Sequence, residues 1–192
     1  MISNITAQNY GQIKPQPSFK GDKDILVIDD NPSGISASEA GIKTALADKV
    51  DEYVIHQAKG GTEGLKKANE VKPFFTVTAY NMPGLGPDAG ELIRKLKQIG
   101  TKVIVHTANW YGQGDISRKA GVKTCEEYYG ADKYVYQFDK DMFQNTVKSM
   151  VEGKELPRYP FQHARTSKAP SSSNNNQNNN WFTRLLNIFR NL

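Results

Sequence analysis

Short apolar runs alternate with longer segments of helical periodicity across residues 22–153, and this alternation limits the fold more than any other feature of the sequence. The clearest run, 24–30, places four aliphatic residues between acids. It predicts a strand buried on both faces, because successive side chains of a strand point to opposite sides. Further strands are expected at 53–57, 74–80, 102–106 and 134–138. Strands that alternate with helices predict an α/β fold with a parallel sheet and helices on both of its faces.

The segments between these runs carry helix signals. Asn31-Pro32-Ser33 ends the first strand and can begin a helix that runs to about Ala47. Other helices are expected at 62–71, 90–99 and 139–152, with a less regular helical region at 109–129. In a sheet of this kind, functional side chains lie at the carboxyl ends of the strands. The residues that follow each run are therefore the candidates for a site.

The chain divides into four segments. Its 192 residues suffice for one well-packed domain with extensions and are too few for two ordinary domains. The periodic segment 22–153 is the expected domain. Residues 1–21 are polar with two prolines, and 154–180 form a linker rich in Ser and Asn, so disordered tails are expected on both sides. The last segment, 181–192, is apolar again.

The net charge of +5 comes from the two ends of the chain. Residues 1–21 carry +2 and 154–192 carry +5, whereas 22–153 carry −2. A nearly neutral domain with basic ends is not typical of nucleic-acid binding, so no nucleic-acid partner is expected. The single cysteine, Cys125, excludes a disulfide within the chain and favours a reducing, cytoplasmic compartment. No apolar run is long enough to span a bilayer, and residues 1–21 lack the pattern of a secretory signal.

Polar side chains and one methyl group meet at the ends of three predicted strands. They are Asp29 and Asp30 after the first strand, Ala79 and Asn81 at the end of the third, and Thr107 after the fourth. These residues belong to ordered motifs: Ile-Leu-Val-Ile-Asp-Asp-Asn at 25–31, Asn-Met-Pro-Gly at 81–84, the run 103–108, and Gly-Ala-Asp at 130–132. In this order and spacing, the motifs resemble the receiver (CheY-like) domain of two-component response regulators over roughly residues 22–153.

The resemblance implies a flavodoxin-like, doubly wound sheet of five parallel strands in the order 2-1-3-4-5. In that family, two acids after the first strand help to hold Mg²⁺, and an aspartate two residues before Asn-Met-Pro accepts a phosphoryl group. A hydroxyl residue after the fourth strand and a lysine after the fifth contact that phosphoryl. Asp29 and Asp30 match the acids, and Thr107 matches the hydroxyl. Tyr134 matches an aromatic residue that changes rotamer on activation.

Two departures from the family pattern remove the phosphorylation chemistry. The acceptor position is Ala79, and the lysine position is Gln137, followed by Phe138 where the family has proline. Forming an acyl phosphate needs a carboxylate nucleophile, which a methyl group does not supply. The missing aspartate is also a Mg²⁺ ligand, so weak Mg²⁺ binding and no other cofactor are expected. Gln137 does not replace the positive charge of lysine in a partly dry pocket.

Several residues keep a second interpretation. Asp29 and Asp30 can instead cap the first helix, and Thr107 can be an ordinary β-forming residue. Tyr134 can be a core contact or a partner-facing side chain. Asp88 can be a turn residue or a substitute acceptor. The residues expected to be only structural or incidental are His56, His106 and Cys125.

The apolar residues of segment 181–192 fall on one side of a helix at about 100° per residue. They are Trp181, Phe182, Leu185, Leu186, Ile188, Phe189 and Leu192. Arg184 and Arg190 lie among the polar residues of the other side. Twelve residues alone form a marginal helix in water, so this amphipathic helix is expected to fold against a surface. That surface is an anionic membrane, a partner protein or its own domain.

The sequence therefore predicts a non-enzymatic pseudo-receiver that binds a protein partner of a signalling system. Its C-terminal helix is expected to locate it, in the cytoplasm and peripherally at the inner membrane surface. The alternative is a phospho-accepting receiver that carries an engineered substitution at Ala79. A third hypothesis, a small enzyme on the flavodoxin-like fold, lacks a nucleophile–base pair and a phosphate-binding glycine loop in the sequence.

Overall fold

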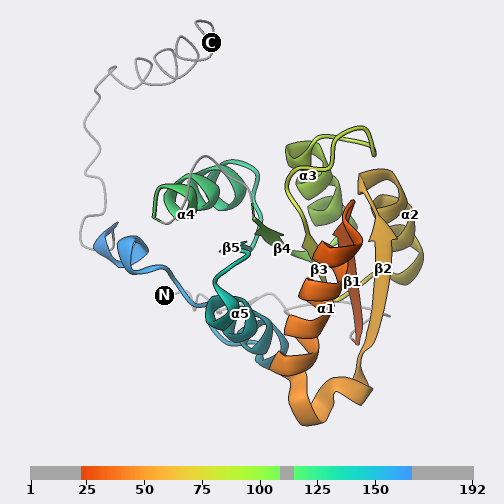
Figure 1. The fold of residues 1–192 in the computed structure, drawn as a ribbon, viewed down its shortest axis with the longest axis horizontal. Coiled ribbons are helices and arrows are strands. Elements are labelled where there is room, and N and C mark those ends of the chain that lie inside the picture. The colour runs from red at the N-terminus through yellow and green to blue at the C-terminus, as the bar shows by residue number, and fades with distance from the viewer. Residues whose placement is uncertain (1–22, 109–114, 166–192) are drawn as a thin grey trace, which may run out of the picture. The chain divides into compact units, whose positions relative to one another are not determined.

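Five parallel strands form one sheet at the centre of the domain (Figure 1). The computed structural model describes residues 23–108 and 115–165, except for the side chains of 163–165. The strands are β1 (Asp24–Asp29), β2 (Val54–Lys59), β3 (Phe75–Thr78), β4 (Lys102–Thr107) and β5 (Lys133–Tyr136). Their order, β2-β1-β3-β4-β5 with every pair parallel, confirms the predicted fold class and strand order. The predicted N-terminal tail 1–21 and C-terminal helix 181–192 lie outside the described residues.

Helices cover both faces of this sheet (Figure 1). They are α1 (Pro32–Leu46), α2 (Gly61–Val71), α3 (Ala89–Ile99), α4 (Asp115–Gly121) and α5 (Lys140–Glu152). Helices α1 and α5 pack against each other on one face, and α2 and α3 are neighbours on the other. Two irregular helices continue α1 and α4: a 3-10 helix, η1 (Ala47–Glu52), and a π-helix, η2 (Val122–Tyr128). A short 3-10 helix, η3 (Pro160–Arg165), belongs to a separate unit that begins at Arg158.

The regular elements start and end within two residues of their predicted positions. The prediction for the last strand was wrong at its end, because β5 stops at Tyr136 instead of 138. A turn begins there, in which the Asp139 N–H donates to the Tyr136 carbonyl (2.8 Å), and it takes Phe138 out of the sheet. The less regular helical region expected at 109–129 contains α4 and the π-helix η2, while residues 109–114 are not described.

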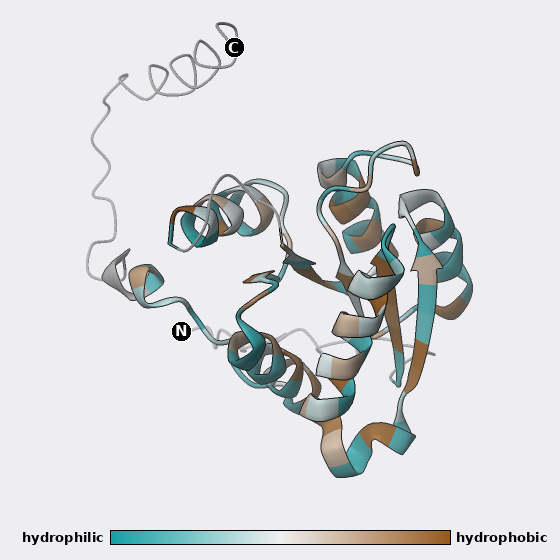
Figure 2. Ribbon diagram, in the orientation of Figure 1, coloured by the Kyte–Doolittle hydropathy of each residue, from teal (hydrophilic) through white to brown (hydrophobic). Residues whose placement is uncertain are grey.

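Alternate side chains of the inner strand β1 contribute to both apolar layers. Ile25 and Val27 belong to the cluster packed against α1 and α5. Ile28 points to the other face, where a side chain at Gly64 of α2 would overlap it. All are at most 1% exposed, and burying each aliphatic side chain contributes roughly 1.5–3 kcal/mol. Figure 2 shows the apolar residues concentrated on these central strands.

Each outer strand of the sheet has one N–H group bound by a glutamate from an adjacent helix. In β2 the Lys59 N–H donates to the Glu63 carboxylate of α2 (3.0 Å). In β5 the Tyr134 N–H donates to the Glu126 carboxylate of η2 (2.9 Å). Glu126 also lies 3.2 Å from the ammonium of Lys133, whose side chain is only 2% exposed. The π-helix is therefore fixed to β5 through one carboxylate.

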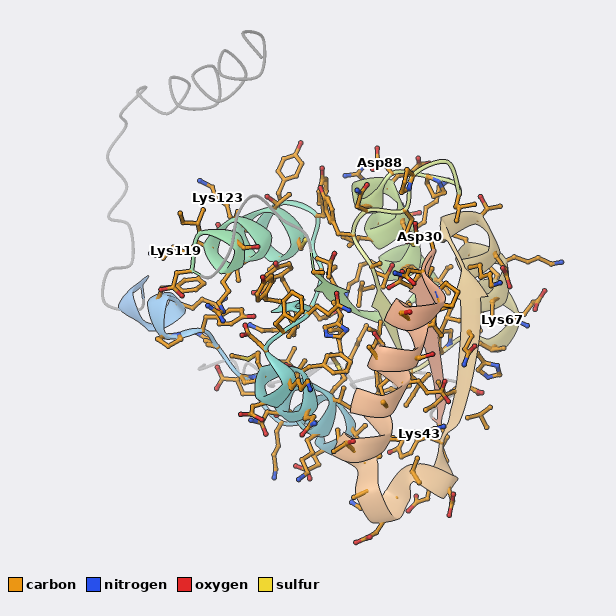
Figure 3. The ribbon with its side chains drawn as sticks, in the orientation of Figure 1. Asp30, Lys43, Lys67, Asp88, Lys119 and Lys123 are labelled. Carbon is orange, nitrogen blue, oxygen red and sulfur yellow. The ribbon has the colours of Figure 1, made fainter. Side chains whose placement is uncertain are left out.

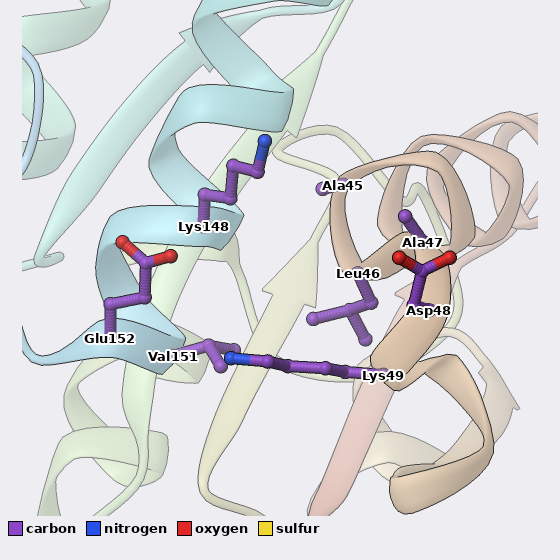
Figure 4. A pocket seen from close by; sticks show the side chains of 8 residues that line it. All are labelled: Ala45, Leu46, Ala47, Asp48, Lys49, Lys148, Val151 and Glu152. Atoms are coloured by element: carbon purple, nitrogen blue, oxygen red, sulfur yellow. The ribbon is translucent and has the colours of Figure 1, made fainter.

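A groove of about 220 Å³ lies where α1 and η1 meet the end of α5 (Figure 4). Its apolar lining comes from Ala45, Leu46, Ala47 and Val151, and its charged lining from Asp48, Lys49, Lys148 and Glu152. The pKa of Glu152 is lowered, first by a hydrogen bond from Lys154 and more weakly by Lys49 and Lys148. The groove thus carries equal numbers of positive and negative side chains and shows no preference for one sign of charge. Among residues 23–108 and 115–165, no helix is long and apolar enough to cross a membrane.

Candidate functional site

The predicted site residues at the strand ends come together at one edge of the sheet. Asp29 ends β1 and Thr107 ends β4. The Ala79 N–H donates to the Ile28 carbonyl (2.9 Å), so the acceptor position lies on the strand beside Asp29. The Gln137 N–H donates to the Thr107 carbonyl (3.0 Å), which brings the lysine position to the same edge. The backbone thus brings these four positions to one edge of the sheet, as the resemblance to receiver domains implies.

Asp29 is half-buried in this pocket. A side chain at Gly34 of α1 would overlap its carboxylate. Burial raises the pKa of Asp29 from 3.8 to about 6, the neighbouring Asp30 adds to the rise, and the Asn31 N–H opposes it with a hydrogen bond (2.9 Å). In the described part of the chain, neither acid forms an ion pair with a lysine or arginine. The pocket therefore holds an uncompensated negative charge at neutral pH.

The first helix is not capped by this acid pair. Asn31 is the N-cap of α1, and its side chain accepts from the Ser33 N–H (2.9 Å). The capping alternative for Asp29 and Asp30 is therefore wrong. Asp88 does act as a cap, because its carboxylate accepts from the Glu91 N–H (2.8 Å) at the start of α3. Figure 3 shows Asp30 and Asp88 at the same end of the domain.

The donor set at this edge does not complete a magnesium site. Asp29 and Asp30 offer two carboxylates, but the third position carries the methyl group of Ala79, which is 8% exposed. Among the described residues, no group of three or more His, Cys, Asp or Glu side chains is arranged to hold a metal. Mg²⁺ prefers several oxygen ligands at near-octahedral geometry, so two neighbouring carboxylates hold it only loosely.

Asn81 lies beyond the pocket and lines a separate cleft of about 450 Å³. Tyr80, Met82 and Asp88 from the β3–α3 loop form one wall, and Tyr129 after η2 forms the other. The Tyr129 ring covers Gly90 at the start of α3, where a side chain would overlap it. The loop after the acceptor position therefore packs on α3 and the end of η2.

Thr107 and Tyr134 are both buried, at 7% and 0% exposure. The Tyr134 ring lies beneath Gly121 of α4, which leaves no room for a side chain at that glycine. Burial raises the pKa of the Tyr134 hydroxyl to about 12, and the nearby Ser117 hydroxyl opposes the rise. Tyr134 is therefore a core contact in this structure, and the partner-facing alternative is wrong.

His106 is one residue from Thr107 and is structural, as predicted. Its Nδ1 lies 2.9 Å from the Ser38 hydroxyl of α1, and its ring stacks on Phe143 of α5 with centroids 4.0 Å apart. Burial lowers the pKa of His106 to about 4, while a hydrogen bond to the backbone of Gln137 opposes this. The neutral imidazole thus joins both helices to the loop that carries the lysine position.

Sequence reasoning missed an ion pair beside the pocket. The Arg118 guanidinium of α4 donates to both carboxylate oxygens of Asp139, which precedes α5. It also lies 3.2 Å from Asp115 and 5.5 Å from the centre of the Tyr136 ring. The pair joins residues 21 positions apart across a region of weak periodicity, and no local pattern in the sequence signals it.

We expect Asp29→Asn to stabilise the domain at neutral pH by about 1–2 kcal/mol, after allowance for the partial exposure of the carboxyl group. The pKa of about 6 exceeds the ordinary 3.8, so the folded state keeps a proton that the unfolded state loses. Wild-type stability from this group is therefore complete below pH 3.8 and falls as the pH rises to about 6. Urea unfolding at pH 4 and pH 7.5 measures the difference. An equal effect of Asp29→Asn at both pH values, with exposed Asp51→Asn as the control, contradicts the prediction.

Comparison with known proteins supports the same family as these motifs. No family model matches the sequence. The response regulators GacA of Pseudomonas protegens and Pseudomonas viridiflava are 39% and 40% identical to this chain over 62 residues. These residues make up 32% of this chain and 27% of each relative, so the match spans about a quarter of the relatives' length.

Solved structures share the fold over most of the domain. A two-component response regulator of the LuxR family from Aurantimonas sp. has a TM-score of 0.51 at 21% identity, over 69% of this chain and 86% of that one. The signal receiver domain of an HD domain-containing protein from Pseudomonas fluorescens has a TM-score of 0.50 at 16% identity, over 74% and 94%. The strand order, the strand-end motifs and the local match to curated response regulators agree. The chain has the fold of response-regulator receiver domains, and it is similar to curated response regulators over 62 residues.

Proposed function

We propose that this chain is a pseudo-receiver, a signalling adaptor that does not accept a phosphoryl group and acts by binding a protein partner. One observation carries the proposal: Ala79, with a buried methyl group, occupies the strand-end position beside Asp29 where the chemistry needs a carboxylate. Receiver domains in general are signalling modules and not enzymes.

Three chemical requirements of phosphoryl acceptance are missing together. A carboxylate nucleophile is absent at Ala79. The Mg²⁺ that would offset charge in the transition state has two carboxylates and not three. A fixed cation stabilises the phosphoryl group most strongly in a site that excludes water. Gln137, at the lysine position, is neutral and does not supply this charge. Asp88 is a poor substitute nucleophile, because its carboxylate already caps α3.

Exposed apolar side chains support binding to a protein partner. Ile116 on α4 and Tyr128 at the end of η2 are each 70% exposed, and Phe138 after β5 is 69% exposed. Large apolar residues are enriched where proteins meet partners and cost solubility elsewhere. These three, the most exposed large apolar side chains of the described residues, lie on α4, η2 and the β5–α5 loop, whereas Val54 on β2 and Leu85 after β3 are less exposed, at 55% and 41%.

We expect no adduct when the full chain is incubated with acetyl phosphate or with beryllofluoride and Mg²⁺. The reason is the joint loss of nucleophile and countercharge at Ala79 and Gln137. Intact-mass spectrometry detects a phosphoryl group, and fluorine NMR detects bound beryllofluoride. Mg²⁺ alone should bind only at millimolar concentrations in a fluorescence or NMR titration. A stable adduct in this pocket, or micromolar Mg²⁺ affinity, contradicts the proposal.

We further propose that residues 181–192 bring the protein to an anionic membrane surface at the cytoplasmic face. This segment lies outside the described residues, and the proposal is supported by its amphipathic pattern in the sequence. Arg184 and Arg190 each add about 1 kcal/mol near anionic lipid.

The full chain is therefore expected to co-sediment with anionic liposomes at low salt and to be released at high salt. A 1–170 truncation and the double variant Trp181→Asp with Phe189→Asp should stay in the supernatant. Equal amounts of full chain and truncation in the supernatant contradict membrane binding. Binding to a protein without lipid, lost in the same double variant, indicates a partner groove instead.

A further inference from the structure

One ion pair joins α4 to the start of α5. The Nε of Arg118 donates to Asp139 Oδ2 (2.7 Å), and its Nη2 donates to Oδ1 of the same carboxylate. The two side chains are 25% and 17% exposed, so the pair is mostly shielded from water. A planar guanidinium that meets a carboxylate with two parallel bonds is the strongest and most directional ion-pair geometry available to side chains.

Both carboxylate oxygens of Asp139 accept hydrogen bonds from Arg118. Asp139 is the N-cap residue of α5, yet its side chain makes no capping bond. Two other polar N-caps among the described residues, Asn31 of α1 and Asp88 of α3, each accept a hydrogen bond from their own helix. The Asp139 carboxylate thus binds Arg118 of α4 and does not cap α5.

A second contact holds the inner face of α4. Ser117 and Gly121 lie one turn apart on that helix, and both are buried. The Tyr134 ring of β5 fills the space beneath Gly121, where a side chain would overlap it. Helix α4 is thus fixed to β5 by close packing and to α5 by the ion pair. Neither contact involves Asp29, Asp30 or Ala79.

We propose that the Arg118–Asp139 pair is a permanent latch that holds α4 in one position, whatever the state of the pocket at the strand ends. The latch deepens the proposed function, on which it rests, by naming its regulation: the domain has a single signalling state. The exposed side chains of Ile116 and Phe138 flank the latched residues in the sequence and are displayed at all times.

Hydrogen–deuterium exchange of the full chain tests the latch. Asp139→Asn keeps the shape of the side chain but removes its charge, and it is expected to speed exchange of 115–128 about tenfold or more, while 24–78 stays as in wild type. The matched control, Asp141→Asn, removes an exposed acid from the same first turn of α5 and should change nothing. Arg118→Lys keeps the positive charge but cannot form the two parallel hydrogen bonds of the guanidinium. It should increase the exchange rate of 115–128 less than Asp139→Asn does.

A charge swap separates a latch from a merely structural residue. Arg118→Asp combined with Asp139→Arg should restore much of the protection that either single change removes. Unchanged exchange of 115–128 in Asp139→Asn, an increase spread evenly over the domain, or no recovery in the swap overturns the latch. These exchange measurements are made without beryllofluoride, so they test the latch separately from the proposed function. An adduct in the pocket with wild-type exchange in 115–128 overturns the pseudo-receiver proposal and leaves the position of α4 fixed.

Discussion

Ala79→Asp combined with Gln137→Lys should give the domain a beryllofluoride adduct that the unsubstituted chain does not form. The backbone already places both positions at the right edge, through the bonds of Ala79 to Ile28 and of Gln137 to Thr107. The added carboxylate supplies a third oxygen ligand, so Mg²⁺ affinity is expected to rise at least tenfold, or about 1.4 kcal/mol. Fluorine NMR with a Mg²⁺ titration measures both effects.

The single variants separate the contribution of the carboxylate at position 79 from that of the lysine at position 137. Ala79→Asp alone puts a third carboxylate beside Asp29 and Asp30, and should lower stability by about 1–3 kcal/mol until Mg²⁺ is added. Gln137→Lys alone should form no adduct, because the nucleophile is still missing. A double variant that gains neither Mg²⁺ affinity nor an adduct shows that the pocket has lost more than two side chains. Full phosphorylation of Ala79→Asp alone instead favours the alternative that Ala79 is an engineered substitution in a working receiver.

Glu126→Gln should destabilise the domain by about 3–5 kcal/mol, because it removes the negative charge that lies 3.2 Å from the buried ammonium of Lys133. Glu126 also accepts the hydrogen bond of the Tyr134 N–H (2.9 Å), which the neutral amide oxygen satisfies less well. Lys133→Met should cost less, since it removes the buried charge itself. Urea unfolding at neutral pH measures the free energies of unfolding.

The double variant is the internal control for this pair. Glu126→Gln with Lys133→Met should recover part of the loss, because no isolated charge remains in the core. The neighbouring exposed residue provides a second control, and Glu127→Gln is expected to change stability by less than about 0.5 kcal/mol. Breaking a buried ion pair is expected to cost roughly 3 kcal/mol. A loss of under about 1 kcal/mol in Glu126→Gln therefore contradicts a stabilising ion pair between Glu126 and Lys133.

The sequence predicted the fold because its main signals are local. The aliphatic run 25–28 is buried on both faces of the sheet, as an uninterrupted apolar strand must be. The sequence did not predict the features that depend on tertiary contacts. Lysine is rarely buried, so the sequence of β5 does not predict that Lys133 is a core residue. The π-helix η2 depends on Glu126 reaching β5, and no periodicity of the sequence encodes that contact.

For the candidate site, too, local signals predicted some features and tertiary contacts determine the others. Asp29, Ala79, Thr107 and Gln137 were placed correctly at one edge, because parallel strands bring their carboxyl ends together and the motifs fix the register. The raised pKa of Asp29 was not predicted, because it follows first from burial of the carboxylate in the folded domain, which sequence spacing does not determine. The Arg118–Asp139 pair was missed for a related reason: it depends on where α4 lies, which sequence spacing does not determine.

The two glutamates at the outer strands have a consequence for how this chain behaves at high concentration. An outer strand with open N–H groups is a template on which another chain can add a strand, and such growth leads to fibrils. Glu63 and Glu126 each occupy one such group, on β2 and β5. An approaching strand therefore finds one N–H group already bonded on each outer strand. Both outer strands are therefore less open to strand addition at these positions, which favours a soluble domain when the protein is concentrated.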